Sequence, residues 1–234
     1  MSARAAVFIA LIGLTAACAG EQGAEMDGRG EADLGVVRTD PFRLTGAFAG
    51  DSYLITPCSD GETDLRLERG PEVLDLIGIH EELVPGDFPV ETIFVDLFGE
   101  AIQDGRDTSF EVIEVYRAGF EDWGCTWVPL ESPLRFAASG TEPGWTLHVG
   151  ADSTVTLSRV EGTREGDVTL LEGSRAAGWE VSGEIEGEAW TLELFEEPCR
   201  NAMSGGYSHL VASLTLGGET WTGCGFIGDA EESL

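Results

Sequence analysis

The fold class of this chain is decided by the stretch Leu210-Val-Ala-Ser-Leu-Thr-Leu-Gly217-Gly218-Glu-Thr-Trp-Thr222. A Gly-Gly pair separates two short segments of strand-forming residues. Glycine enters the positive-φ region of a tight turn without steric cost. The sequence therefore predicts a β-hairpin whose strands lie at residues 210–216 and 219–222.

Short strands and glycine-rich turns continue upstream of this hairpin as far as Leu134. Strands are expected at residues 145–149, 154–160, 168–171, 179–184 and 189–195. Such regular spacing is typical of a small antiparallel barrel or sandwich. We therefore predict an antiparallel β-barrel or β-sandwich domain at residues 131–227, followed by an acidic tail at residues 228–234.

A second group of strands precedes this domain. Alternating apolar and polar residues predict strands within residues 42–56, 64–68, 91–103 and 109–118. Between them, apolar residues at helical spacing predict one short helix from Pro71 to Leu83, with the proline in its first turn. The predicted fold class is thus all-β with one short helix, and residues 41–130 form the first domain.

The N-terminus has the features of a bacterial lipoprotein signal peptide. Arg4 precedes an apolar run over residues 5–14, which is too short to span a membrane, and Leu14-Thr-Ala-Ala17 precedes Cys18. These residues predict a signal peptide at residues 1–17 and a lipid on Cys18. Ordinary secretion with a spare thiol is the alternative. Residues 18–40 are predicted to be a disordered acidic linker, because they cannot bury enough apolar surface to fold.

The charge of the chain excludes several functions. It has no lysine, and thirteen arginines stand against forty-three acidic residues, for a formal net charge of −30. Such a surface repels nucleic acid and anionic lipid. Without lysine, Schiff-base chemistry, the Walker A loop and lysine-activated serine nucleophiles are excluded. The acidity fits either a salty medium or a surface that binds cations or a cationic partner, and the sequence leaves both open.

Four cysteines remain after Cys18 is set aside. An even number in an oxidising compartment predicts structural disulfides, and four cysteines allow three pairings. Pairing within each domain is the simplest choice, which joins Cys58 to Cys125 and Cys199 to Cys224. Neither pair has the spacing of a redox-active Cys-x-x-Cys motif or a nearby histidine.

Two motifs resemble an uncharacterised family of bacterial envelope lipoproteins. The first is Ser139-Gly-Thr-Glu-Pro-Gly-Trp-Thr-Leu147, and the second runs from Cys199-Arg-Asn201-Ala-Met-Ser-Gly to Gly-Cys224. In that family, motifs of this kind bracket one β domain, and an aspartate is usual at the position of Asn201. The resemblance covers residues 132–226 and implies the same β domain here.

Residues 41–130 resemble the OB-like C-terminal domain of the envelope-stress lipoprotein NlpE. The matching features are the opening Leu44-Thr-Gly-Ala-Phe-Ala, Cys58 at the first turn, the central helix and the two strands after it. The resemblance implies an OB-like barrel. The Cys-x-x-Cys motifs of NlpE lie in its other domain and have no counterpart here, so its signalling role does not carry over.

Candidate site residues are few. Trp145, which follows Glu142 in the first motif, is the best candidate for a ligand contact, since aromatic side chains line many binding pockets. The six tryptophans fit core packing equally, and the sequence leaves both roles open. Three scattered histidines form no metal site, and Gly223-x-Gly-x-x-Gly228 precedes no helix of the kind that a dinucleotide site needs. No catalytic residue, metal or cofactor is therefore expected.

These features predict a non-enzymatic lipoprotein of the bacterial envelope, anchored to a membrane by its lipid, that binds a small ligand or has a structural role. The alternative is a binding or inhibitor module for a cationic protein such as a lysozyme, because a net charge of −30 would speed the encounter. A hydrolase using two carboxylates is a third hypothesis without a specific signal. Ala19 after the lipidated cysteine favours the outer membrane, facing the periplasm, in a Gram-negative host.

Overall fold

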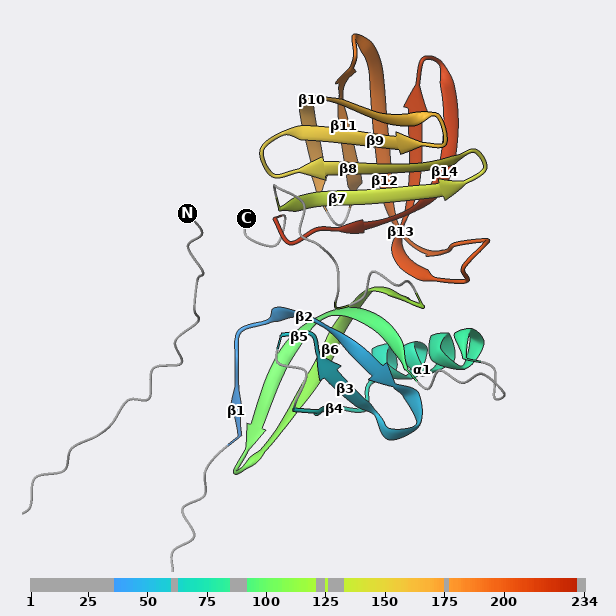
Figure 1. Cartoon of the computed structure of the whole chain (residues 1–234). Coiled ribbons are helices and arrows are strands. Elements are labelled where there is room, and N and C mark those ends of the chain that lie inside the picture. Colours follow the sequence, from blue (N-terminus) through green and yellow to red (C-terminus); the bar gives the residue numbers. More distant parts are fainter. Residues whose placement is uncertain are drawn as a thin grey trace, which may run out of the picture. The chain divides into compact units, whose positions relative to one another are not determined.

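The computed structural model describes residues 36–59, 63–84, 92–120, 125, 133–174 and 177–230 (Figure 1). These residues form fourteen strands, one α-helix and one 3₁₀ turn, so the predicted all-β class with one short helix is confirmed. The signal peptide, Cys18 and most of the predicted linker lie outside the described residues. Within the described ranges, no helix has the length and apolar character needed to cross a membrane.

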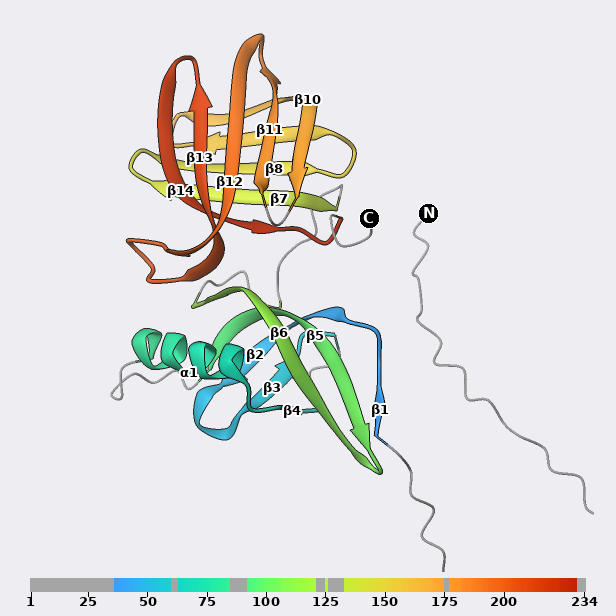
Figure 2. The ribbon, with the colours of Figure 1, turned by 180° about the vertical axis from the view of Figure 1, so that it is seen from behind.

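Eight strands of the second half close into a barrel, which Figure 2 shows from behind. They are β7 (Leu134–Thr141), β8 (Gly144–Gly150), β9 (Thr154–Arg159), β10 (Gly162–Ser174), β11 (Gly178–Ile185), β12 (Glu188–Arg200), β13 (Tyr207–Leu216) and β14 (Glu219–Ile227). Each strand pairs antiparallel with the next, and β14 pairs with β7. Of the two architectures left open by the sequence, the antiparallel barrel is the one that forms.

The interior of this barrel is filled by side chains that alternate along its strands. On β12, Trp190, Leu192 and Leu194 are buried, and the residues between them face outward. The barrel core also contains the three remaining described tryptophans, at positions 145, 179 and 221. Burial of one large apolar side chain stabilises a fold by about 1.5–3 kcal/mol. Core packing is therefore the role of these four tryptophans, whereas Trp123 and Trp127 lie outside the described residues.

Five strands of the first half form a second ring. They are β2 (Phe42–Ala49), β3 (Leu54–Pro57), β4 (Leu65–Leu67), β5 (Ile93–Asp104) and β6 (Asp107–Gly119). They pair in the order β2-β3-β4-β6-β5-β2, antiparallel throughout except for the parallel pair β4–β6. This order, with a helix between the third and fourth strands, is the topology of an OB-fold barrel. The predicted OB-like barrel is confirmed.

The helix α1 (Pro71–Leu83) begins and ends where the sequence predicts. Pro71 occupies the first turn, where the missing N–H is not needed. Val73, Leu76 and Leu83 recur at the spacing of one helix face and are buried in the core of the OB ring. On another face, Leu74 is 61% exposed.

The last residues of the predicted linker, 36–40, are described and include a short strand, whereas residues 18–35 lie outside the described residues. The short strand β1 (Val37–Arg38) pairs with β5, and the Arg38 guanidinium forms ion pairs with Glu100 and Glu111. The linker composition gave no sign of this strand, because its hydrogen-bond partners lie more than sixty residues away.

Other strand boundaries also differ from the expected ones. No strand was assigned to β7, whose Ala-Ala-Ser-Gly content carries little β-propensity. β10, β12 and β14 run past their predicted ends because neighbouring strands continue to pair with them. The backbone N–H groups of Gly228 and Ala230 donate to carbonyls at the start of β7, so the first residues of the predicted tail are held by the barrel.

Both predicted disulfide bonds are confirmed. Cys58 is joined to Cys125, with a Cα–Cα distance of 4.9 Å, and Cys199 to Cys224, with a Cα–Cα distance of 5.5 Å. The second bond ties β12 to β14, which lie on either side of β13. It therefore holds the β12–β13 turn against the last strand.

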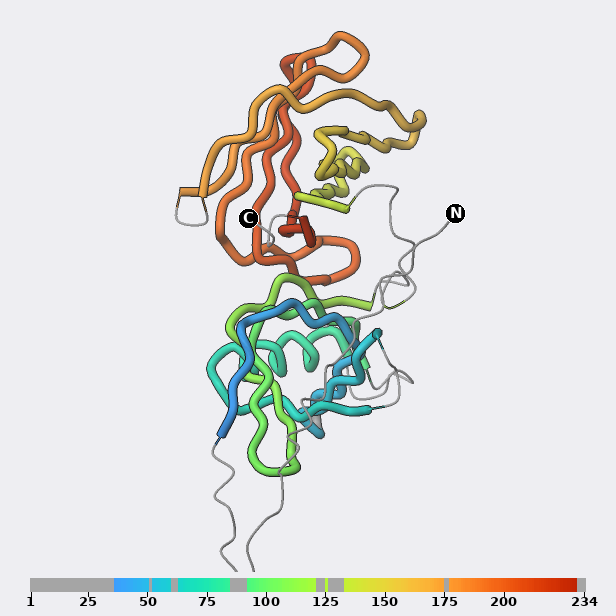
Figure 3. The backbone as a smooth tube through the Cα atoms, turned by 90° about the vertical axis from the view of Figure 1, so that its left-hand side faces the viewer, coloured from blue at the N-terminus to red at the C-terminus, as the bar shows by residue number. Residues whose placement is uncertain are grey.

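The two rings share one continuous sheet, since β6 pairs antiparallel with β13 through Ala118 opposite Tyr207 and Arg117 opposite Ser208. Figure 3 follows the chain through both rings. Residues Leu34–Leu234 form one compact unit. The division into two independently folding domains near residue 131 stays a prediction.

Three glutamates lie side by side on the outer face of the barrel. Glu172 on β10 pairs with Glu180 on β11, which pairs with Glu193 on β12. Like charges directly opposite each other destabilise a sheet, and added salt screens them. Glu180→Arg should therefore raise the melting temperature by a few degrees and weaken its dependence on salt, measured by circular dichroism from low to molar NaCl. An unchanged melting temperature would mean that the three carboxylates do not repel each other measurably.

Candidate functional site

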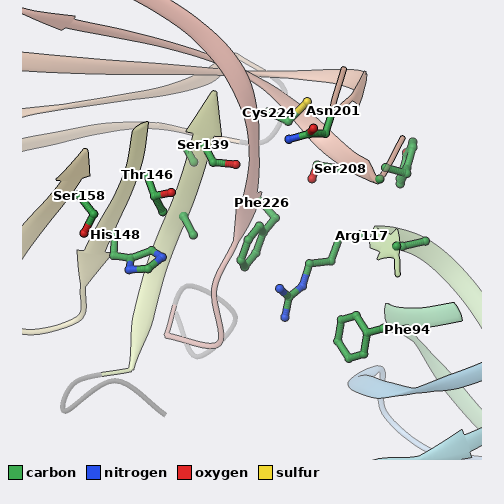
Figure 4. A pocket seen from close by; sticks show the side chains of 16 residues that line it. Phe94, Arg117, Ser139, Thr146, His148, Ser158, Asn201, Ser208, Cys224 and Phe226 are labelled. Carbon is green, nitrogen blue, oxygen red and sulfur yellow. The ribbon is translucent and has the colours of Figure 1, made fainter. Parts of the chain in front are cut away.

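The candidate site is a cleft of about 400 Å³ against the outer surface of the eight-stranded barrel (Figure 4). Strands β7, β8, β9 and β14 contribute one side of it. The ends of β5 and β6 contribute the facing side, and residues of the β12–β13 turn and the start of β13 complete the rim. The cleft therefore depends on segments from both halves of the chain.

Small hydroxyl side chains form the barrel side of the cleft. Ser139 on β7 lies opposite Thr146 on β8, which lies opposite Ser158 on β9. The row continues to Thr163 on β10, whose hydroxyl is 3.2 Å from that of Ser158. These residues alternate with inward-facing core residues such as Leu147 and Leu157, so the strand pleat directs them outward. We call these four residues the hydroxyl row.

An arginine between two aromatic rings forms the facing side. The Arg117 guanidinium carbon lies 4.9 Å from the ring centre of Phe94 and 4.3 Å from that of Phe226. Its Nε donates to Oδ2 of Asp96 at 3.0 Å. Asp96 is fully buried and also accepts two hydrogen bonds from Arg43, at 2.6 and 2.5 Å. The carboxylate thus fixes Arg117 in place and offsets part of its charge.

The rim is set by the turn after Cys199. Asn201 Oδ1 accepts hydrogen bonds from the backbone N–H groups of Met203 and Ser204, at 2.9 and 3.0 Å. The Asn201 side chain therefore closes the turn by bonding to the backbone that follows it. The turn is then fastened to β14 by the Cys199–Cys224 bond, and both Asn201 and Cys224 line the cleft.

His148 lines the cleft from β8, and burial lowers its pKa below the ordinary 6.5. The imidazole is therefore neutral at neutral pH and can both donate and accept a hydrogen bond. Because the folded pKa lies below the unfolded one, the unfolded chain takes up the proton first as the pH falls. The stability due to neutral His148 is thus complete above about pH 6.5 and is lost below it.

His148→Gln should remove this part of the pH dependence, so the variant should lose less stability than the parent as the pH drops below about 6.5. Urea denaturation at a series of pH values measures the difference. Parallel curves for the two proteins would show that His148 does not contribute to it.

Among the residues that the structure describes, none of the sixteen that line the cleft is Asp or Glu, although the chain has forty-three of them (Figure 4). Its polar groups are hydroxyls, one amide, one imidazole and the Arg117 guanidinium, whose charge Asp96 offsets in part. Such a lining suits a neutral, hydrogen-bonding ligand.

A second cavity, of about 560 Å³, has an acidic lining. It lies among α1, β6, β12 and β13, and five acidic residues line it together with one arginine. The exposed apolar side chains of Leu74 and Ile113 also belong to it. Arg200 pairs with Glu82 at 2.9 Å, and the pKa of Tyr207 is raised by burial and by the nearby charges of Glu114 and Asp75, against an opposing effect of Arg200. We call this cavity the acidic groove.

The residues proposed from the sequence as ligand contacts lie elsewhere. Trp145 is 3% exposed in the barrel core, and Glu142 is exposed in the turn between β7 and β8. Neither lines the cleft or the acidic groove. Within the described ranges, no three His, Cys, Asp or Glu side chains gather as metal ligands. Sequence reasoning missed the hydroxyl row, although its members alternate with apolar residues on consecutive strands.

Comparisons with known proteins add no relative: no family model, no curated protein and no solved structure matches this chain. The structure by itself defines the class, an OB-fold ring that shares a sheet with an eight-stranded antiparallel barrel.

Proposed function

We propose that this chain is a lipid-anchored, non-enzymatic binding protein of the bacterial cell envelope, whose cleft holds a small, neutral, polar ligand. The anchor is the lipid on Cys18, and the signal features around residues 1–17 support it. Ala19 favours the outer membrane of a Gram-negative host, with the folded part in the periplasm. The single observation that supports the binding role is a cleft whose described lining has no carboxylate, in a chain of net charge −30.

The charges decide which ligands suit the cleft. A cationic ligand would find no carboxylate in the lining and would be drawn to the acidic surface outside it. An anionic ligand would be repelled by the chain as a whole, and the one lining arginine already pairs with Asp96. A neutral ligand meets neither obstacle, and hydroxyl, amide and imidazole groups can satisfy its hydrogen bonds.

NMR titration tests the choice of ligand class. We expect millimolar glucose and acetamide to shift backbone amides of the cleft lining, and spermidine and citrate to leave them unchanged. Ser139→Phe, which fills the cleft, should abolish the shifts. Thr215→Phe is the matched control, since Thr215 also lies at a half-buried position of the barrel but does not line the cleft. Equal shifts in both variants, or shifts from citrate alone, would contradict the proposal.

The anchor has its own test. Cys18→Ser should release the protein from the membrane fraction without loss of fold, because a serine at this position cannot be acylated through sulfur. Fractionation of producing cells followed by circular dichroism of the released protein measures both effects. A variant that still sediments with membranes would show that something other than the lipid holds the chain there.

The acidic groove favours a second candidate function, the binding of a cationic protein. Its five acidic residues line the groove together with exposed Leu74 and Ile113, so a basic segment with an apolar residue would complement it. Hen egg-white lysozyme is a suitable basic probe. Asp75→Asn with Glu196→Gln should weaken its binding more than Glu165→Gln with Glu184→Gln, which changes the net charge equally outside the groove. Equal weakening by both pairs would indicate attraction by net charge alone.

A further inference from the structure

The members of the hydroxyl row are paired across neighbouring strands of the barrel sheet. Ser139, Thr146, Ser158 and Thr163 are directly paired across β7, β8, β9 and β10. Neighbouring strands lie about 4.8 Å apart, so the row crosses the four strands over about 14 Å, and the hydroxyls of its last two members, Ser158 and Thr163, lie 3.2 Å apart. The first three members line the cleft, and the fourth extends the row beyond it.

A second row runs beside the first on the same outer face. Phe226 on β14 pairs with Ala137 on β7, which pairs with His148 on β8. Two residues along a strand span about 6.7 Å, so the two rows flank a shallow track across the strands. One side of the track bears hydroxyls, and the other bears the partly exposed ring of Phe226 and the neutral imidazole of His148, with Ala137 buried between them.

From this juxtaposition we infer that the cleft binds an extended neutral glycan, whose chain crosses β7, β8 and β9 with one sugar unit for each strand. The inference rests on the proposed function, and it names the ligand class of the same site. A glycan repeats hydroxyl groups at an interval close to the strand spacing, and its sugar rings present C–H faces that pack against the exposed part of the Phe226 ring, on the side that Arg117 leaves open. It carries no charge, which suits a described lining without carboxylates whose arginine is paired with Asp96.

Another series of hydroxyl side chains on the same barrel serves as a control for the hydroxyl row. A second cross-strand hydroxyl series lies on β11 to β14 and consists of Ser182, Thr191, Thr215 and Thr220. The hydroxyls of its last two members are 3.0 Å apart. These residues line neither the cleft nor the acidic groove. If a hydroxyl series alone bound a glycan, this series would bind it too.

The test compares oligosaccharides of different length on the intact folded chain. Isothermal titration with cellohexaose, cellobiose and glucose should give an affinity that rises at least tenfold from the disaccharide to the hexasaccharide. Thr146→Val and Ser158→Val should each weaken cellohexaose binding by about two- to tenfold, the effect of one lost hydrogen bond. Thr215→Val should leave the affinity unchanged.

The outcomes separate the two proposals. If glucose and acetamide shift the cleft amides in NMR spectra but cellohexaose binds no tighter than cellobiose, the glycan inference is overturned and the neutral-ligand site stands. If no neutral probe reaches the cleft, both fail. If Thr215→Val weakens cellohexaose binding as much as Thr146→Val does, the sugar binds the barrel surface without using the cleft, and the inference is again overturned.

Discussion

Asp96→Ala should lower the free energy of unfolding by about 3–5 kcal/mol, because removing one partner of a buried ion pair leaves the other charge uncompensated. Here one carboxylate is lost and two guanidinium groups remain. Asp96 is 0% exposed, and the side chains of Arg43 and Arg117 are only 10% and 17% exposed. Arg117 also stacks between Phe94 and Phe226, so its side chain cannot turn to water without opening that contact.

Urea denaturation measures the loss, and Asp229→Ala is the matched control. Asp229 pairs with the same Arg43 at 3.2 Å but is 81% exposed. Exposed ion pairs contribute about 0–1 kcal/mol. A loss in Asp96→Ala no greater than that in Asp229→Ala would mean that the buried carboxylate is not what holds the two arginines.

The second large effect is expected from removal of the Cys199–Cys224 bond. Its partners are 25 residues apart, and the loop-closure model gives such a bond about 3.5 kcal/mol of stability. The double variant Cys199→Ala with Cys224→Ala frees the β12–β13 turn from β14. Because Asn201 and Cys224 line the cleft, we expect the variant to lose ligand binding at temperatures where the barrel remains folded.

A variant that lacks the other disulfide bond, Cys58–Cys125, is compared with this one. Its partners are 67 residues apart, so the same model gives a somewhat larger stability loss of about 4 kcal/mol. Neither cysteine lines the cleft, and binding should survive in the folded variant. Calorimetric titration with glucose at low temperature shows which of the two disulfide-deleted variants still binds the ligand. Equal retention of binding in both would show that the turn is held without its disulfide.

Local sequence signals predicted the elements that depend on local chemistry. The Gly217-Gly218 turn, the helix that begins at Pro71 and the two disulfide bonds each have a cause within a few residues or in a count of cysteines. Strand β7 and the length of β10 depend instead on partner strands. Single-strand propensity does not contain that information, because β-propensity largely reflects cross-strand packing.

The site was harder to predict than the fold. Trp145 was chosen because aromatic side chains line pockets, yet it shares its strand face with Leu147 and Val149 and is buried with them. The same alternation places Thr146 and His148 on the opposite face, so periodicity alone could have placed them on the outer face that bears the cleft. Arg117 could not be assigned from the sequence, because its partners Asp96 and Phe226 come from two other strands.

Hydrogen–deuterium exchange with and without a neutral saccharide tests the central claim most directly, since it reports where on the folded chain a ligand binds. With cellohexaose present, the proposed site predicts slower exchange in β7 to β9 and in residues 201–208. It predicts unchanged exchange at the turn that contains Glu142 and along α1. Slower exchange confined to that turn, or no change anywhere in the folded chain, would contradict the assignment of the cleft as the binding site.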